Sequence, residues 1–260
     1  MHEKGLKERL KNDEVVLGTW NIISSPALIE VIGYSGLDFV IIDSEHGPVN
    51  VESTENLIRA ADAIGIEAVV RVPANDSHFI LRALDIGACG IQVPHISTKK
   101  QAELIVEYAK YHPGGKRGFS PFTRAAGYGS RAESHIKDSN KNTLIVVNIE
   151  GVDGIKNLKD IIKVSGIDVI FIGPYDLSQS LGKPGKVGDE DIVRILRESA
   201  DIVKSKGLAC GSFANSIEYL DILIDAGMQY VTYMVDSAFI LQSYKELRNF
   251  FNRKINTKNE

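Results

Sequence analysis

Cysteine is nearly absent from this 260-residue chain, and long hydrophobic runs are missing altogether. The two cysteines, Cys89 and Cys210, lie in separate apolar segments, which favours buried free thiols in a reducing compartment over a disulfide. Without a CxxC pair or a Cys/His cluster, a structural zinc site is not expected. No apolar run approaches the roughly 18 residues that a membrane-spanning helix needs, so the sequence predicts no membrane insertion.

A strong excess of charge of either sign is also lacking. The chain carries 30 Lys and Arg against 34 Asp and Glu, a net charge of −4, and the two signs are interspersed. No basic patch of the kind that binds nucleic acid is present. The N-terminal segment "MHEKGLKERLKNDE" is charged and has no hydrophobic signal region, so we expect a cytoplasmic protein.

Eight short apolar runs do recur, separated by segments with apolar residues at helical spacing. The runs are continuous rather than alternating, as in strands that are buried on both faces. They cover residues 14–20, 38–43, 67–72, 89–94, 143–150, 168–173, 208–213 and 230–236. Eight strand–helix units in about 250 residues predict a TIM (β/α)8 barrel, an α/β fold. A doubly wound sheet is the alternative, but no glycine-rich phosphate fingerprint follows any of the strands.

Nothing in the sequence resembles a linker between domains, so residues 1–260 are expected to form a single domain. Asp76 and Ser216 are predicted N-caps of helices. Five glycines stand where helices should end, at Gly65, Gly87, Gly166, Gly207 and Gly227. The stretch at 112–142 is the longest irregular one, which is uncommon unless a loop is functional or disordered. A last helix is predicted near residues 237–252.

Polar residues gather at the predicted carboxyl ends of the strands, where barrel enzymes carry their reactive groups. They are rich in acids and include no lysine. The set comprises Trp20, Asn21, Asp43, Glu45, His46, Arg71, Gln92, His95, Asn148, Glu150, Asp176 and Asp236. Such a set suits an anion and a metal ion. Because a Schiff-base aldolase needs a lysine inside the barrel, any carbonyl chemistry here should be metal-assisted.

Glu150 and Asp176 follow consecutive strands, so their carboxylates should lie one or two strand spacings apart. Two hard oxygen ligands, with the other positions left to water and substrate, suit Mg²⁺, Mn²⁺ or a similar divalent ion such as Co²⁺. The alternative is that each carboxylate only caps the helix that follows it.

A general base and an anion-binding group are also present at the strand ends. His46 lies three residues after Asp43, and a carboxylate paired with an imidazole raises its basicity and fixes its tautomer. We therefore predict that Asp43 orients His46, and His95 is a second candidate for the base. Arg71 would place a guanidinium in the barrel mouth, where either an internal acid or an anionic substrate must balance its charge.

Taken in order, these residues resemble the HpcH/HpaI aldolase family, the class II pyruvate aldolases of the phosphoenolpyruvate/pyruvate barrel superfamily. The resemblance runs over nearly the whole chain, through "LGTW", "DFVIIDSEHGPVN", "VVRVP", "HPGGKRG", "NIEG" and "FIGPYDLS". It implies that Glu150 and Asp176 bind the metal and that Arg71 clamps the substrate. His46 would be the base, with Asp43 as its partner.

The resemblance also implies a carboxylate site in the segment "FIGPYDLS". The carboxylate of pyruvate would lie on the backbone N–H groups of Tyr175 and Asp176, at the start of a helix. Gly173 would let the backbone approach the ligand closely, and Pro174 would make the turn rigid.

The activity implied is reversible cleavage of a 4-hydroxy-2-oxo acid into pyruvate, or a close 2-oxo acid, and an aldehyde. A homo-oligomer is implied as well, a hexamer or trimer of dimers, with the last helix packing on a neighbouring subunit. One alternative is a related lyase that acts on a citramalyl- or malyl-CoA thioester or decarboxylates oxaloacetate. The pocket beyond the metal, including the loop at 112–142, would distinguish the two. A non-catalytic metabolite-binding barrel is the other alternative.

Two departures from the family pattern lie near the predicted site. Many members carry a glutamine where this chain has Asn148, whose shorter amide can still reach substrate. Relatives commonly have a glycine before the last strand-end aspartate, where this chain has Met234 and Val235.

Overall fold

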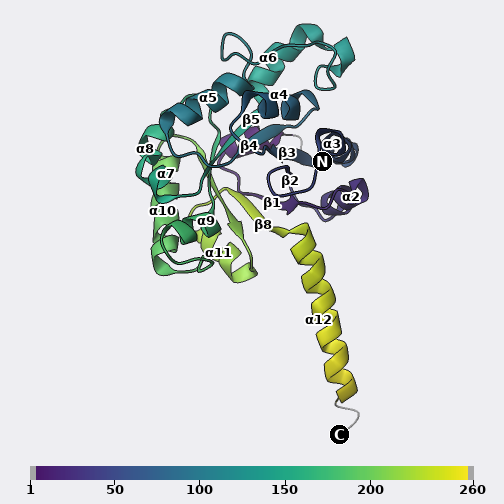
Figure 1. Ribbon diagram of the computed structural model, residues 1–260, viewed down its shortest axis with the longest axis vertical. Coiled ribbons are helices and arrows are strands. Elements are labelled where there is room, and N and C mark those ends of the chain that lie inside the picture. The colour runs from purple at the N-terminus through teal and green to yellow at the C-terminus, as the bar shows by residue number, and fades with distance from the viewer. Residues whose placement is uncertain (1–3, 257–260) are drawn as a thin grey trace.

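The computed structural model describes residues 4–256 and contains a closed barrel of eight parallel strands (Figure 1). Each strand pairs with the next one along the chain, and β8 closes on β1. The predicted TIM barrel is therefore confirmed, with every strand within two residues of its expected bounds. The strands are β1 (Val16–Asn21), β2 (Phe39–Asp43), β3 (Glu67–Arg71), β4 (Gly90–Val93), β5 (Leu144–Ile149), β6 (Val169–Ile172), β7 (Ala209–Ala214) and β8 (Tyr230–Val235).

Helices follow the strands, and their ends match the predicted caps. They are α1 (Leu6–Lys11), α2 (Pro26–Tyr34), α3 (Val51–Ile64), α4 (Ser77–Asp85), α5 (Lys99–Ala109), the 3-10 turn η1 (Gly127–Gly129), α6 (Ala132–Asn142), α7 (Val152–Lys156), α8 (Leu158–Ile161), α9 (Pro174–Ser180), α10 (Glu190–Lys204), α11 (Ile217–Asp225) and α12 (Asp236–Asn256). The side chains of Asp76 and Ser216 accept backbone hydrogen bonds at the starts of α4 and α11. All five predicted terminal glycines have positive φ, the region that favours glycine.

Aromatic side chains fill the inside of the barrel. Phe39 of β2 stacks on Tyr230 of β8 with ring centroids 4.3 Å apart, and Trp20 of β1 meets Phe171 of β6 edge-on at 5.9 Å. Glycine makes room for these rings, because a methyl group at Gly18 would lie 2.5 Å from the ring of Phe39. The interior is a packed core rather than a pore, so the space for a ligand lies at the ends of the strands.

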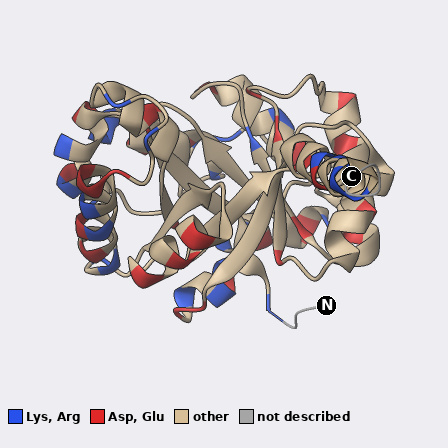
Figure 2. Cartoon of the chain, turned by 90° about the horizontal axis from the view of Figure 1, so that it is seen from below, with Lys and Arg blue, Asp and Glu red and all other residues tan. Residues whose placement is uncertain are grey.

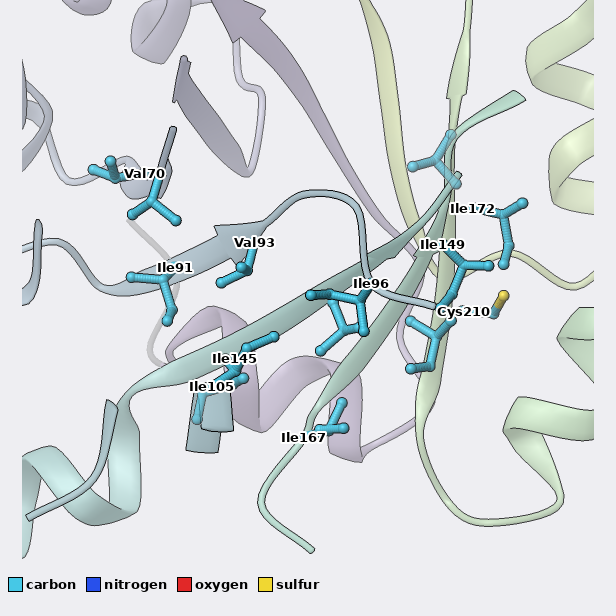
Figure 3. Packing of buried hydrophobic residues seen from close by; sticks show 14 of the residues in the cluster. Val70, Ile91, Val93, Ile96, Ile105, Ile145, Ile149, Ile167, Ile172 and Cys210 are labelled. Atoms are coloured by element: carbon cyan, nitrogen blue, oxygen red, sulfur yellow. The ribbon is translucent and has the colours of Figure 1, made fainter. Parts of the chain in front are cut away.

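Branched aliphatic residues form a second core between the strands and the helices. The outward-facing Ile91, Ile145 and Ile149 are fully buried, as are Ile96 and Ile105 in the segments packed outside them (Figure 3). Burying one such side chain contributes roughly 1.5–3 kcal/mol. This layer holds the carboxyl ends of β4 and β5 in fixed positions.

The segment between α5 and β5 lies at the amino ends of the strands, because a helix-to-strand connection in a TIM barrel returns to that end. Two ion pairs hold this segment against the helices: Arg117 pairs with Asp85 at 2.6 Å, and Arg124 pairs with Asp62 at 2.5 Å. Both arginines line a cavity of about 1000 Å³ there, and these ion pairs account for their charge. Two expectations for residues 112–142 were therefore wrong. The last eleven residues form α6, and the segment does not line the mouth of its own barrel.

Helix α12 extends away from the barrel instead of covering it (Figure 1). Its first residue, Asp236, is buried, whereas the large apolar side chains along its length are exposed. These are Phe239, Leu241, Tyr244, Leu247, Phe250, Phe251 and Ile255. The helix predicted at 237–252 is confirmed, and its packing on a neighbouring subunit stays a prediction.

The outer helices carry acidic and basic residues mixed together rather than separated into faces of one sign (Figure 2). Among residues 4–256, no helix combines the length and apolarity that crossing a membrane requires. Both cysteines are free, as predicted, although only Cys210 is fully buried and Cys89 is partly exposed. Burial raises the pKa of both thiols, that of Cys210 to about 12.

The buried imidazole of His135 predicts sensitivity to acid. Burial, and then the nearby Arg117 and Arg131, lower its pKa below the usual 6.5. The unfolded chain therefore takes up a proton more readily than the folded one, so stability present above about pH 6.5 is lost as the pH falls through that value. Urea titrations between about pH 8 and pH 5 should show the free energy of unfolding of wild type falling relative to that of His135→Gln. His78→Gln, at an exposed histidine, is the control. If the difference in free energy of unfolding between wild type and His135→Gln does not change with pH, His135 is not the source of the acid sensitivity.

Candidate active site

The register of the parallel strands places polar side chains side by side at the barrel mouth. Asp43 at the end of β2 pairs in register with Arg71 of β3, and Arg71 with Gln92 of β4. Ile41 and Val69, two residues earlier on the same strands, belong to the interior core. Because side chains two apart share a face of a strand, Asp43 and Arg71 also point inward.

Asp43 and Arg71 form a bidentate ion pair. Nε of Arg71 donates to Oδ1 at 2.8 Å and Nη2 to Oδ2 at 2.5 Å, and the aspartate side chain is only 3% exposed. Oδ1 also accepts hydrogen bonds from the backbone N–H groups of Glu45 and His46. The predicted Asp43–His46 side-chain pair is thus corrected. The guanidinium occupies both oxygens, so Asp43 orders the backbone of His46 and leaves its imidazole exposed at the mouth.

Arg71 has two further neighbours in the mouth. Its Nη1 lies 3.1 Å from Oε2 of Glu45, and its guanidinium lies over the ring of Trp20, 4.3 Å from the centroid. Internal acids therefore balance the arginine in this structure, which was one of the two alternatives from the sequence. Burial raises the pKa of the Glu45 carboxyl, and Arg71 opposes that rise.

Glu150, just after β5, has donors on both carboxylate oxygens. Nδ2 of Asn148 donates to Oε1 at 2.9 Å, and the backbone N–H of His95 donates to Oε2 at 2.9 Å. Nδ1 of His95 lies 2.6 Å from the same Oε2, and its Nε2 lies 2.9 Å from Oε1 of Glu45. A continuous series of polar contacts therefore runs across the mouth through Asp43, Arg71, Glu45, His95, Glu150 and Asn148.

The carboxylates of Glu150 and Asp176 are hard oxygen donors of the kind that a divalent ion takes. Neither caps a helix, because the N-caps of α7 and α9 are Gly151 and Gly173 and show no side-chain cap bond. A methyl group at Gly173 would lie 2.9 Å from Cγ of Glu150, so glycine lets the end of β6 lie close to that side chain. Asp176 is exposed in the first turn of α9. No three His, Cys, Asp or Glu side chains within residues 4–256 are grouped to hold a metal ion.

Four buried polar atoms at the strand ends around this cluster have no hydrogen-bond partner among the described residues. They are Nε2 of Gln92, Oδ1 of Asn148, Oδ1 of Asn21 and Oε2 of Glu45, the last of which lies in the ion pair with Arg71. Since buried polar groups are almost always paired with protein or water, a donor and an acceptor are left for a small polar ligand.

Met234, one of the two departures noted in the sequence, has a backbone conformation that suits glycine better than methionine. Its φ is +57°, a left-handed conformation that favours glycine, and the pairing of β8 with β1 shifts register at this point. The carboxylate of Asp236, two residues on, accepts hydrogen bonds from the Asn21 amide and from the backbone of Ile22 and Ile23. Asp236 therefore anchors the start of α12 to the end of β1, a structural role.

Sequence reasoning underrated Glu45 and His95. The sequence analysis places Glu45 among the polar residues at the strand ends without giving it a role, and takes His95 only as a second candidate base, yet both lie between Arg71 and Glu150. The local signal was present, since each lies two residues beyond the end of a strand. Their contact joins β2 to β4 and β5, which no local pattern reveals.

Comparison with known proteins identifies the family of this chain and several of its relatives. The family model described as HpcH/HpaI aldolase/citrate lyase matches residues 17–242. The chain is 31% identical to a 2-dehydro-3,6-dideoxy-6-sulfogluconate aldolase of Pseudomonas putida, over 92% of this chain and 93% of that protein. It is also 31% identical to a hydroxypyruvate/pyruvate aldolase of Roseobacter denitrificans, over 93% and 94% of the two chains.

A solved structure with similar coverage is that of the citrate synthase SbnG. It superposes with a TM-score of 0.85 at 33% identity and covers 98% of this chain and 99% of its own. The relatives of this chain therefore include proteins named as aldolases and one named as a synthase.

The Asp43–Arg71 pair predicts a large loss of stability when one partner is removed. Asp43→Ala leaves the guanidinium of Arg71, whose side chain is only 12% exposed, without its bidentate partner, and two backbone N–H groups without an acceptor. We expect the free energy of unfolding in urea to fall by about 3 kcal/mol or more. Glu55→Ala, which breaks the exposed Arg59–Glu55 pair, should cost less than about 1 kcal/mol. A similarly small loss in Asp43→Ala would mean that Glu45 alone balances Arg71.

Proposed function

Since this chain belongs to the HpcH/HpaI aldolase/citrate lyase family, we propose that it is a divalent-metal-dependent aldolase. It reversibly cleaves a 4-hydroxy-2-oxo acid into pyruvate, or a close 2-oxo acid, and an aldehyde. Family membership makes the chain a carbon–carbon lyase, and the names of the two aldolase relatives support a 2-oxo acid as donor.

One observation carries the proposal: an arginine and an oriented glutamate lie within one network of polar contacts at the barrel mouth. Arg71 supplies a fixed positive charge, held by Asp43 and Glu45. Asn148 and His95 turn the carboxylate of Glu150 to a single orientation. A charge that develops on an enolate oxygen can therefore be met by groups already in place, which is the basis of electrostatic catalysis.

The residues divide the binding of the 2-oxo acid among them. Glu150 and Asp176 would hold the divalent ion, Mg²⁺, Mn²⁺ or Co²⁺, which would supply Lewis-acid polarisation of the 2-oxo acid. The backbone N–H groups of Tyr175 and Asp176 accommodate the carboxylate after the rigid turn at Gly173 and Pro174. The unpaired oxygen of Asn148 faces the remaining polar groups of the substrate.

His46 moves the proton in the proposed reaction. Its exposed imidazole lies on a turn whose backbone Asp43 holds in place. In cleavage it removes the proton from the hydroxyl of the hydroxy-oxo acid, and the carbon–carbon bond then breaks to release the aldehyde. The guanidinium of Arg71 stabilises the enolate that remains, and protonation of that enolate yields pyruvate.

A second candidate function is kept because of the 33% identity to a citrate synthase. The same groups stabilise any pyruvate-like enolate, so a lyase that acts on an acyl-CoA thioester, or an oxaloacetate decarboxylase, would use them as well. The groups beyond the enolate distinguish these activities, and substrates of both kinds belong in the assay.

We also propose that a homo-oligomer is formed through α12. Seven large apolar side chains on this helix are between 41% and 68% exposed, which is a large apolar surface for a helix that lies clear of its own barrel. A second copy of the chain is the natural partner, since the family resemblance implies a hexamer or trimer of dimers.

The activity can be tested with a panel of aldehydes and pyruvate. With Mn²⁺ or Mg²⁺ present, at least one aldehyde should consume pyruvate, chelation should abolish the rate, and Mn²⁺, Mg²⁺ or Co²⁺ should restore it. Borohydride should trap no adduct with pyruvate, because no lysine is proposed in the site. A lysine adduct would contradict the metal-dependent mechanism, and activity on oxaloacetate or acyl-CoA thioesters alone would favour the second candidate.

The separate roles of His46 and Glu150 predict different defects. His46→Ala should bind Mn²⁺ and pyruvate with nearly parental affinity in calorimetry, while its cleavage rate falls by roughly 10² to 10⁴, the usual contribution of a positioned base. Glu150→Ala should lose Mn²⁺ and pyruvate binding together. Full cleavage activity in His46→Ala would show that another group is the base.

The role of α12 predicts that charge on its apolar surface dissociates the oligomer. Leu247→Glu should reduce the mass measured by light scattering, because a buried unpaired carboxylate at an interface is costly. Lys245→Glu, at a polar position of the same helix, is the control. An unchanged mass for Leu247→Glu would place the contact elsewhere.

A further inference from the structure

His95 has a strained backbone at the edge of the proposed site. Its φ is +59°, a conformation that non-glycine residues seldom adopt. Residues held in sparsely populated regions persist only where their surroundings determine them, and they gather at functional sites. The role proposed for His46 leaves His95 without a part in the reaction.

The surroundings of His95 show what holds it. The side chain is 68% exposed, yet both ring nitrogens face carboxylates at hydrogen-bond distance. Its backbone N–H and Nδ1 both contact Oε2 of Glu150, at 2.9 and 2.6 Å. Together with the Asn148 amide on Oε1, these contacts resist rotation of the Glu150 carboxylate.

The other ring nitrogen links two halves of the site. Nε2 contacts Oε1 of Glu45, whose Oε2 in turn lies 3.1 Å from Nη1 of Arg71. In the described part of the chain, only the His95 side chain contacts both Glu45 and Glu150 at hydrogen-bond distance. The imidazole therefore spans the gap between the arginine side and the glutamate side of the mouth.

We propose that His95 is a positioning residue that orients Glu150 for the divalent ion and ties it, through Glu45, to Arg71. The inference rests on the proposed function, because it takes Glu150 as a metal ligand. Removing a group that orients a metal ligand typically weakens metal binding by about 10- to 100-fold. A ring held at both nitrogens also keeps the metal carboxylate and the arginine at a constant separation, as a 2-oxo acid bound between them requires.

Two amide substitutions separate the two contacts of the ring. The side-chain nitrogen of asparagine can take the place of Nδ1, so His95→Asn keeps the contact to Glu150. Asparagine also tolerates positive φ better than most residues. The nitrogen of glutamine reaches the place of Nε2, so His95→Gln keeps the contact to Glu45 and loses that to Glu150. His95→Ala loses both.

The experiment is titration of Mn²⁺ alone into the full-length variants, by calorimetry and by the electron paramagnetic resonance signal of free Mn²⁺. His95→Ala and His95→Gln should bind Mn²⁺ about tenfold or more weakly than wild type, whereas His95→Asn should remain close to it. His78→Ala, an exposed histidine in the first turn of α4, is the control for loss of an imidazole. In the cleavage assay, His95→Asn should raise KM for the hydroxy-oxo acid more than it lowers kcat, because only the link to Glu45 is cut.

Each outcome decides between the two claims. If wild type does not bind Mn²⁺, or if Glu150→Ala binds it equally well, the proposed metal site is wrong and the inference falls with it. Mn²⁺ binding by wild type but not by Glu150→Ala would support the metal site. If His95→Ala then binds Mn²⁺ as tightly as wild type or more tightly, the positioning role of His95 is wrong. An unchanged KM in His95→Asn would overturn the link to Arg71.

Discussion

A guanidinium held within the barrel mouth constrains every group around it. Removing Arg71 from water is costly unless acids meet it with good geometry, and Asp43 and Glu45 do so from the end of β2 and the turn that follows it. Asp43 in turn holds the backbone of Glu45 and His46. The turn that presents the imidazole is therefore ordered because the arginine is balanced, and the proposed binding and proton-transfer groups depend on the same pair.

The two ends of the barrel serve different purposes. At the carboxyl ends, acidic and amide side chains face one another with unsatisfied atoms left between them. At the amino ends, the charges are paired internally, as in the contacts of Arg117 and Arg124 with α4 and α3. The stacked rings of Phe39 and Tyr230 fill the space between. This packing lets the mouth hold several carboxylates without weakening the fold that supports them.

Two of the four non-glycine residues with positive φ in the described part of the chain lie near the mouth. His95 and Met234 both have positive φ, the first after β4 and the second near the end of β8. At His95 the contacts to Glu45 and Glu150 offset the cost. Met234 lies two residues before Asp236, whose carboxylate accepts hydrogen bonds from the end of β1. Asp236 is also the first residue of α12, which extends away from the barrel. The direction of α12 is thus set at the rim of the proposed site.

Residue patterns along the chain are enough to predict the barrel, the strand ends and the residues at the mouth. Continuous apolar runs of strand length, separated by helical spacing, permit few other folds, and the polar residues after each run must lie at the same end. Which side chains pair within the mouth depends on the packing of the folded chain. Chain proximity suggested that Asp43 orients His46, but the register of β2 and β3 sets Arg71 beside it, and a guanidinium is the stronger bidentate partner of a carboxylate. The bridging role of His95 and the outward course of α12 depend on contacts between residues far apart in the chain, which local patterns do not encode.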